Sequence, residues 1–381
     1  MKTRKSRHQK TYKRCLVVFI IICIGICAYL FYPHSYQSMD KRAVWFSYID
    51  LAKFSYESKD DFEHDFIEAI QTVKTYKTNT IMVQVRAFSD ALYDSSLFPL
   101  SQVITNQTSL SFDPLEVMIQ LAHDYGLAIE AWVNPYRISL NQETYLQFVT
   151  YSKYKNWIRD TTKVIQYDDY KYILNPQSQE VRDYIVEGVK EIVSHCDVDG
   201  ICFDDYFYVE GTHENTTQNQ RLDNVNMLIH DVYYSIKQID QQVTFGISPQ
   251  GNYENCIQQG VDVDLWLKEE GYIDYLMPQI YWTDHYGENG QTKMFTNRTK
   301  QFSKLKKHQS VSLYASLALY QAGLDLEFDQ GWSLSNKNIS EQITILSRYG
   351  YKGYGIFSYS SLLNEDGKKE MDYLIKHNPF L

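Results

Sequence analysis

The feature that most constrains this chain is a regular alternation of two kinds of segment from residue 41 onward. Apolar runs rich in β-branched and aromatic residues alternate with amphipathic stretches of helical period, which is typical of parallel strands joined by crossover helices. The eight predicted strands cover residues 43–50, 80–88, 127–135, 198–206, 243–250, 273–281, 311–320 and 353–359. The predicted helices cover residues 61–76, 113–125, 178–194, 219–239, 293–307, 339–349 and 367–376. Eight such units in roughly 340 residues predict an α/β fold, a (β/α)8 TIM barrel with long loops after the second, third and fourth strands.

A doubly wound open sheet is the alternative fold for the same alternation. Its nucleotide-binding members carry a Gly-rich phosphate-binding loop directly after a strand. No predicted strand of this chain is followed by such a loop. The barrel is therefore the favoured fold.

The first forty residues have the composition of a membrane-targeting segment. Residues 15–32 carry no charge, and 18 helical residues span roughly 27 Å, close to the ~30 Å core of a bilayer. Residues 1–14 hold seven Lys or Arg and no acid, which favours a cytoplasmic amino terminus. We expect an uncleaved single-pass signal anchor in the cell membrane, then a linker at 33–40 and an extracellular barrel at 41–381. A cleaved signal peptide is the alternative, although no small-x-small cleavage site follows.

The remaining charge and the cysteines exclude several function classes. From residue 15 onward there are 30 basic residues against 47 acidic ones, a net charge of −17 that would repel nucleic acid. Cys196, Cys202 and Cys256 are scattered and odd in number, so they predict neither a disulfide framework nor a zinc site. We expect no nucleic-acid partner, no metal and no cofactor.

Strand periodicity predicts which side chains face the barrel lumen. In the second strand Ile81, Val83 and Val85 take the outward positions, because side chains alternate between the two faces. The inward positions of strands two to six are then Gln84, Arg86, Glu130, Trp132, Asn134, Cys202, Asp204, Tyr206, Gly246, Ser248, Gln250, Met277, Gln279 and Tyr281. Barrel interiors are normally apolar, and barrel enzymes bind substrate at the carboxyl ends of the strands. Polar groups converging there predict a binding site.

The sharpest motif is DGICFDDYFY at residues 199–208. Asp204 takes an inward position and Asp205 lies at the strand end. Two adjacent carboxyl groups suit glycosidic chemistry, because one can protonate the leaving oxygen while the other stabilises the anomeric carbon, and each raises the pKa of its neighbour. A helix cap or loop ion pair is the structural alternative. A calcium or magnesium site is another, although no further carboxylates stand at regular spacing.

Aromatic side chains follow several predicted strands. Flat rings cover the apolar faces of sugars, and neighbouring amide and guanidinium groups bind sugar hydroxyls. Packing at the barrel rim would also explain any single ring. As a cluster, these residues predict a carbohydrate groove: Trp132, Asn134, Tyr136, Arg137, Tyr206, Tyr208, Gln279, Tyr281 and Trp282.

Several ordered motifs resemble one protein family. RAVWFSYIDL, QVRAFSDALYDSSLFP, NPYRI, DGICFDDYFY, FGISPQGN and DYLMPQIYW, between about Arg42 and Tyr359, are similar to the bacterial glycosyl-hydrolase-like 10 family. The resemblance implies a TIM barrel of an exported or lipid-anchored protein, some of whose relatives hydrolyse cell-wall glycan. It implies a cleft lined by Arg86, Asp90, Asn134, Arg137, Asp204, Asp205, Tyr206, Tyr208, Gln279, Tyr281 and Trp282. Ala87, Val209 and the SPQG sequence depart from the usual family residues.

These observations lead to one expected function and one alternative. The expected function is a membrane-anchored glycoside hydrolase that acts on peptidoglycan or a related wall polysaccharide. Asp205 is the expected general acid, Asp204 the nucleophile or stabiliser, and Glu130 a reserve candidate for either role. Strand four also resembles the DGxDxDxE motif of chitinase-type barrels, but Cys202 and Tyr206 replace two of its acids. The alternative is a glycan-binding or scaffold protein without turnover.

Overall fold

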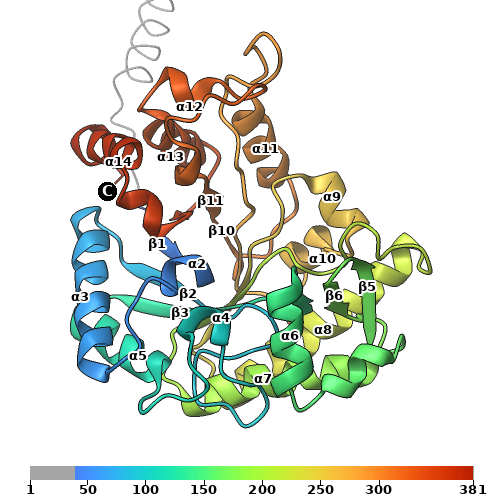
Figure 1. The fold of residues 1–381 in the computed structure, drawn as a ribbon. Helices are drawn as coiled ribbons and strands as arrows, with labels where there is room; N and C mark the ends of the chain where they lie inside the picture. The colour runs from blue at the N-terminus through green and yellow to red at the C-terminus, as the bar shows by residue number, and fades with distance from the viewer. Residues whose placement is uncertain (1–38, 381) are drawn as a thin grey trace, which may run out of the picture. The chain divides into compact units, whose positions relative to one another are not determined.

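The computed structural model of the chain describes residues 39–380, and its strands form one nearly closed parallel barrel (Figure 1). The strand order is β10-β9-β8-β7-β3-β2-β1-β12-β11, with every neighbouring pair parallel. The ends of this order, β10 and β11, are separated in the chain by Tyr314 alone, so together they occupy the seventh strand position. The strands are β1 (Lys41–Phe46), β2 (Thr80–Arg86), β3 (Ala128–Val133), β7 (Gly200–Phe203), β8 (Thr244–Ile247), β9 (Tyr275–Leu276), β10 (Ser312–Leu313), β11 (Ala315–Leu317) and β12 (Gly353–Ile356).

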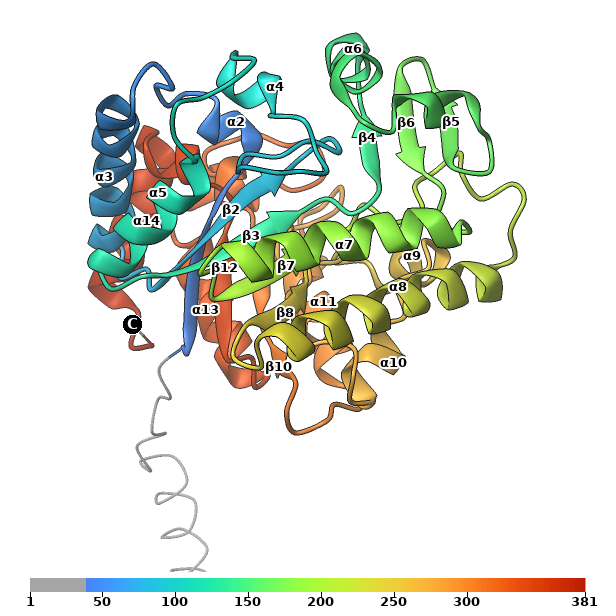
Figure 2. The same ribbon diagram turned by 90° about the horizontal axis from the view of Figure 1, so that it is seen from below.

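Helices surround the barrel, as Figures 1 and 2 show. The main ones are α3 (Lys59–Thr75), α5 (Pro114–Asp124), α7 (Gln179–His195), α8 (Gln218–Ile239), α11 (Met294–Ser303), α13 (Asn338–Arg348) and α14 (Glu365–His377). Short helices α9 (Tyr253–Gln258) and α10 (Val263–Lys268) stand between β8 and β9. Helix α5 begins as its sequence predicts, since the Asp113 side chain accepts hydrogen bonds from the N–H groups of Leu115 and Glu116 and Pro114 opens the first turn.

A small second sheet is the largest feature that the sequence did not predict. It lies in the connection between β3 and α7 and has the antiparallel order β4-β6-β5. Figure 2 shows it set apart from the barrel strands, beside α6. Its elements are β4 (Arg137–Ser139), α6 (Gln142–Tyr151), the 3-10 turn η1 (Lys155–Arg159), β5 (Val164–Asp168) and β6 (Lys171–Leu174). Further short elements are α2 (Tyr48–Leu51), α4 (Gln102–Thr105), η2 (Leu319–Gln321), α12 (Gly331–Leu334) and η3 (Tyr359–Leu362).

The lumen has its own apolar layer, separate from the core between strands and helices. It comprises Ala43, Trp45, Met82, Trp132, Cys202, Tyr275 and Met277, all buried. Trp45 and Trp132 meet edge to face with ring centroids 5.0 Å apart. This layer fills the middle of the barrel, as expected for a packed lumen, and leaves polar groups at its two ends.

The predicted tail at 1–14, the anchor at 15–32 and most of the linker lie outside the described residues. Between Met39 and Phe380, no helix combines the length and apolar character needed to cross a bilayer.

Candidate active site

A cavity of about 330 Å³ opens at the carboxyl ends of the barrel strands. This volume lies at the small end of the range of roughly 300–1,000 Å³ that is usual for ligand sites. The lining residues lie in or directly after all eight strand positions, so the barrel itself sets their placement. They are Trp45, Ser47, Tyr48, Ile49, Gln84, Trp132, Arg137, Asp204, Asp205, Ser248, Gln279, Tyr281, Tyr320, Phe357, Ser358 and Ser360.

Asp204 follows the last residue of β7 and is held in place by its neighbours. Only 5% of the residue is exposed. Its Oδ1 accepts a hydrogen bond from the Tyr206 backbone N–H at 3.1 Å, and its Oδ2 accepts one from the Asn134 side-chain amide. Asn134 is itself fixed, because its Oδ1 accepts from the Gln84 amide and from Arg137 Nη2 at 2.9 Å. Three neighbouring strands thus orient one carboxyl group.

Asp205 lies beside it and is half-buried. Gln279 Nε2 donates to its Oδ1 at 3.3 Å and to the Ser248 carbonyl oxygen at 3.0 Å. The interactions of Asp204 and Asp205 therefore come from different neighbouring strands, although the two residues are consecutive.

Burial raises the pKa of both carboxyl groups, because the charged form loses water. The negative charge of Asp205 adds to this effect and raises the pKa of Asp204 to about 7, against the lowering influence of Arg137. The two groups titrate as a pair, so the pair retains a proton up to neutral pH. A carboxyl group that keeps its proton at neutral pH can protonate a leaving oxygen.

Aromatic rings form the wall next to this pair. Phe357 lies 6.2 Å from Trp132 and 6.0 Å from Tyr281 between ring centroids. The indole N–H group of Trp45 and the Ser248 hydroxyl are buried and have no hydrogen-bond partner among residues 39–380. The cavity therefore combines apolar ring faces with an acidic pair.

Most of the predicted site residues come together here. Trp132, Arg137, Asp204, Asp205, Gln279 and Tyr281 line the cavity, and Asn134 contacts it through Asp204. Tyr206 stands at the edge, with its ring centroid 4.9 Å from Arg137 Cζ. Six further lining residues were not predicted as site residues, although Gln84 was assigned to the lumen: Trp45, Ser47, Tyr48, Gln84, Tyr320 and Phe357. They could have been predicted from their positions at the ends of strands one, two, seven and eight.

Arg86 was predicted to face the lumen, and this was wrong. The pairing of β2 with β3 shifts register between Gln84 and Arg86, so the alternation of faces breaks there. The Arg86 guanidinium instead lies 3.7 Å from the Phe98 ring centroid and packs on α7, where a Cβ at Gly188 would approach Nη1 to 2.6 Å. It is fully buried, and its nitrogen atoms have no hydrogen-bond partner within the described chain.

Three other predicted cleft residues also lie away from the cavity. Asp90 accepts from the backbone N–H groups of Ala87 and Phe88, at 3.0 and 2.8 Å, and so fixes the turn after β2. Tyr208 is fully buried and its hydroxyl oxygen accepts from the Asn224 amide at 2.9 Å. Trp282 packs against Arg298, 5.9 Å from its guanidinium. These residues support the loops and do not line the pocket.

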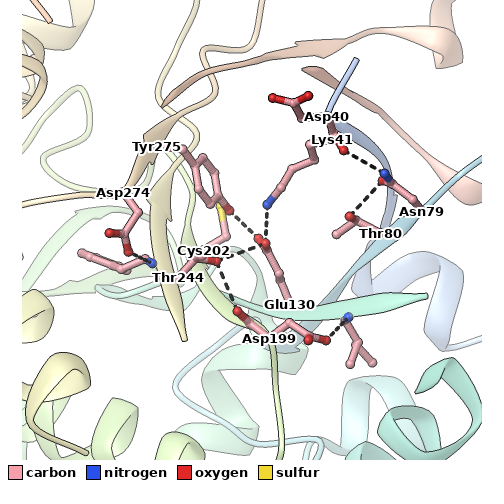
Figure 3. A network of polar contacts seen from close by, with 12 residues as sticks. Asp40, Lys41, Asn79, Thr80, Glu130, Asp199, Cys202, Thr244, Asp274 and Tyr275 are labelled. Atoms are coloured by element: carbon pink, nitrogen blue, oxygen red, sulfur yellow. Dashed lines mark hydrogen bonds and ion pairs between the residues drawn. The ribbon is translucent and has the colours of Figure 1, made fainter. Parts of the chain in front are cut away.

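Glu130 faces the lumen as predicted, but its partners open strands β1, β8 and β9, so it lies at the end of the barrel opposite the cavity. Figure 3 shows these contacts. The Glu130 carboxylate forms an ion pair with Lys41, accepts from the Tyr275 hydroxyl at 2.5 Å and from the Thr244 hydroxyl at 3.3 Å. The apolar lumen layer lies between it and the cavity. Strand periodicity predicted correctly that Glu130 faces the lumen, but it did not predict at which end of the lumen Glu130 lies. Glu130 is therefore not placed to act on a ligand in the cavity.

The cation site considered for the acidic pair finds no further ligands. No three His, Cys, Asp or Glu side chains of the described chain are grouped so that they could hold a metal ion.

Comparison with known proteins gives relatives of a consistent kind. The sequence is 29% identical to glycosyl hydrolase YngK of Bacillus subtilis strain 168, over 88% of this chain and 71% of that protein. It is 27% identical to glycosyl hydrolase DigH of Escherichia coli K12, over 71% of this chain and 68% of that protein.

Solved structures share the fold at low sequence identity. The glycoside hydrolase domain of PgaB (BpsB) from Bordetella bronchiseptica superposes with a TM-score of 0.58 at 11% identity, covering 88% of this chain and 98% of that one. The endo-1,4-β-mannanase of Rhizomucor miehei gives 0.54 at 11% identity, covering 90% and 96%. Both likenesses confirm the barrel architecture.

The sequence motifs pointed to one family, and the family description that matches residues 40–334 is "Glycosyl hydrolase-like 10". The match includes the acidic pair and most of the cavity lining, and it ends before β12 and the lining residues Phe357, Ser358 and Ser360. The chain belongs to the glycosyl hydrolase-like 10 family.

Proposed function

We propose that the protein is a glycoside hydrolase in which Asp204 and Asp205 carry the reaction. The observation that carries the proposal is a pair of adjacent carboxyl groups, one buried and one half-buried, inside a cavity with aromatic walls, where burial raises the pKa of both groups. The proton serves the leaving oxygen, and the charge left on the pair stabilises the cationic anomeric carbon. The proposed acid is Asp205, because it is the less buried carboxyl group. Asp204 is the stabilising anion, because two N–H donors already hold it.

The proposed substrate is peptidoglycan or a related wall polysaccharide. The uncharged segment at 15–32 and the basic residues before it support a membrane-anchored protein with its barrel outside the cytoplasm. There, an anchored barrel would meet wall glycan. Fractionation of cells that express the chain with and without residues 1–38 tests this location. Loss of membrane association in the shortened chain is expected, whereas a full-length chain in the soluble cytosolic fraction would overturn the proposed anchor.

Hydrolysis is tested on isolated cell-wall sacculi, with and without their stem peptides. The detergent-solubilised full chain should release soluble fragments with new reducing ends, detected by mass spectrometry. Asp204→Asn and Asp205→Asn should each lower this release by roughly 100-fold or more, as expected when a general acid or charge stabiliser is lost. Asp325→Asn, at an exposed position outside the cavity, is the matched control and should retain full activity. Binding of the glycan without any product would favour the alternative scaffold function.

A further inference from the structure

The acidic pair has an arrangement that constrains how a glycan can be cleaved. Both carboxyl groups of the cavity lining belong to consecutive residues at the end of one strand. In direct two-carboxylate hydrolysis, the groups flank the scissile bond, with about 5–5.5 Å between them for a retaining enzyme and 6.5–9.5 Å for an inverting one. Among residues 39–380, no carboxyl group lines another wall of the cavity. The site therefore lacks a partner carboxylate across the substrate.

Asp50 is a further carboxylate just behind the lining, and it is already occupied. It is 1% exposed. One oxygen accepts from the Ser47 backbone N–H at 2.9 Å and from the Ser47 hydroxyl at 2.7 Å, and the other accepts from the Ser360 backbone N–H at 3.0 Å. Asp50 thus holds together two segments of the cavity wall and has no free path to an anomeric carbon.

Asp204 is placed to accept a hydrogen bond from an N–H group of a ligand. Each of its oxygens accepts one N–H hydrogen bond from a group that is itself fixed. A nucleophilic carboxylate must move onto the anomeric carbon, whereas this one is restrained from two sides at 5% exposure. Each oxygen still has lone-pair capacity for a ligand N–H. The geometry suits an anion that binds an amide N–H and stabilises positive charge on it.

An apolar recess lies next to this carboxylate. The Trp132 ring packs edge to face with the rings of Trp45 and Phe357, and the Tyr281 ring adjoins Phe357. The Tyr281 hydroxyl is already bonded to Ser316 Oγ at 2.9 Å. A recess of ring faces beside an amide-binding carboxylate is complementary to an acetamido group, whose methyl is apolar and whose nitrogen donates. A sugar with a bare 2-hydroxyl has no methyl group to fill it.

From these contacts we infer that the substrate is a 2-acetamido sugar chain and that its own acetamido oxygen is the nucleophile. The inference rests on the proposed glycoside hydrolase function. Asp205 gives its proton to the glycosidic oxygen as the bond from that oxygen to C1 breaks, and the acetamido carbonyl oxygen forms a new bond to C1. The product is an oxazolinium ion whose N–H donates to the Asp204 carboxylate. Water then attacks C1 and gives a proton to Asp205, which opens the ring and restores the acetamide with retained configuration.

The test uses the full chain and one batch of peptide-free wall glycan in three forms. The glycan is N-deacetylated, and portions are then re-acylated with acetyl or with trifluoroacetyl groups. The re-acetylated glycan should be cleaved, and the free-amine form should be cleaved at least about 100-fold more slowly because the intramolecular nucleophile is gone. The trifluoroacetyl form should lower kcat by about tenfold or more with a smaller change in KM, since fluorine weakens the carbonyl nucleophile while the group still binds.

The outcomes distinguish a failure of the acetamido mechanism from a failure of the proposed hydrolase function. Equal cleavage of the free-amine and re-acetylated forms, or an inverted product by NMR, would overturn the acetamido mechanism and leave the hydrolase intact. Failure to cleave any form would remove the proposed function itself. Binding of the thiazoline analogue of N-acetylglucosamine gives a separate reading of Asp204. Asp204→Asn should weaken it by about tenfold or more, the usual effect of losing a charged hydrogen-bond partner, and Asp205→Asn should retain it.

Discussion

Replacing Glu130 by glutamine should destabilise the barrel and leave turnover unchanged. The Glu130 residue is 3% exposed and the Lys41 side chain 11% exposed, so their ion pair is largely shielded from water. Glutamine keeps the shape of the side chain and removes the charge, which leaves the Lys41 ammonium without its counter-charge. Breaking one side of a buried ion pair costs roughly 3–5 kcal/mol, and the partial exposure of Lys41 favours the lower value, about 3 kcal/mol.

That free energy converts into a measurable shift of the melting temperature. About 340 folded residues have an unfolding entropy near 0.7 kcal/mol/K, so a loss of about 3 kcal/mol lowers Tm by about 4 °C. The double variant Lys41→Met with Glu130→Leu removes both charges and should recover most of the loss, because apolar replacements of a buried pair are often neutral. Thermal unfolding followed by circular dichroism measures both variants.

The same variant separates a structural carboxylate from a catalytic one. At a temperature well below both melting points, Glu130→Gln should hydrolyse glycan with the wild-type kcat, since its carboxylate lies beyond the apolar lumen layer. Asp205→Asn should show the converse, a lost kcat without a lowered Tm. If Glu130→Gln loses turnover while it remains folded, the separation of the two ends of the lumen is wrong.

Four further predictions test the site and its surroundings. Because Asp204 and Asp205 share one proton that Asp205 donates, kcat should fall as the pair loses this proton, at about pH 7 from the raised pKa of Asp204; a rate that is flat from pH 5 to 9 would contradict the shared proton. Because the pKa of Asp204 is higher in the folded than in the unfolded chain, its contribution to the free energy of unfolding is fully present below about pH 4 and is lost as pH rises through 7. Asp204→Asn should therefore raise Tm relative to wild type more at pH 8 than at pH 4. Arg86→Met should change KM by less than about twofold, because the guanidinium packs on α7; a tenfold rise would return Arg86 to the cleft. Gly246→Ala places a Cβ 1.9 Å from Cζ of the Tyr275 ring and should cost about 3 kcal/mol or more by denaturant unfolding, whereas wild-type stability would refute the lumen packing.

The strand positions were predictable because each barrel strand is a short apolar run between polar turns. All eight predicted strands overlap an observed one, and the observed strands are shorter. The β4-β6-β5 sheet was missed because its strands have only 3, 4 and 5 residues and mix polar with apolar residues, so they lack the apolar run that marks the barrel strands.

For the site, the alternation of side chains along a strand predicted which face each side chain takes. It did not predict depth, the position of the side chain along the barrel axis. Asp204 and Glu130 share inward positions on neighbouring strands, yet they lie on opposite sides of the Trp132 layer. Depth depends on the stagger between strands, which the sequence of a single strand does not contain. The prediction that Arg86 faces the lumen failed for a related reason, because one register shift reverses the face of every later side chain.

The two ends of the lumen neutralise buried carboxylates in different ways, and the difference bears on function. Glu130 has a lysine for a partner, so the pair is neutral without a proton to exchange. At the other end Arg137 is the nearby cation, but its Nε donates to the Ala87 carbonyl oxygen at 2.7 Å and its Nη2 to Asn134, so it reaches Asp204 only through an amide. Without a direct cation, the acidic pair lowers its charge by retaining a proton. A proton held in this way can be transferred to a substrate. The acidic pair, which has no lysine partner, is therefore suited to acid catalysis, whereas Glu130 is not.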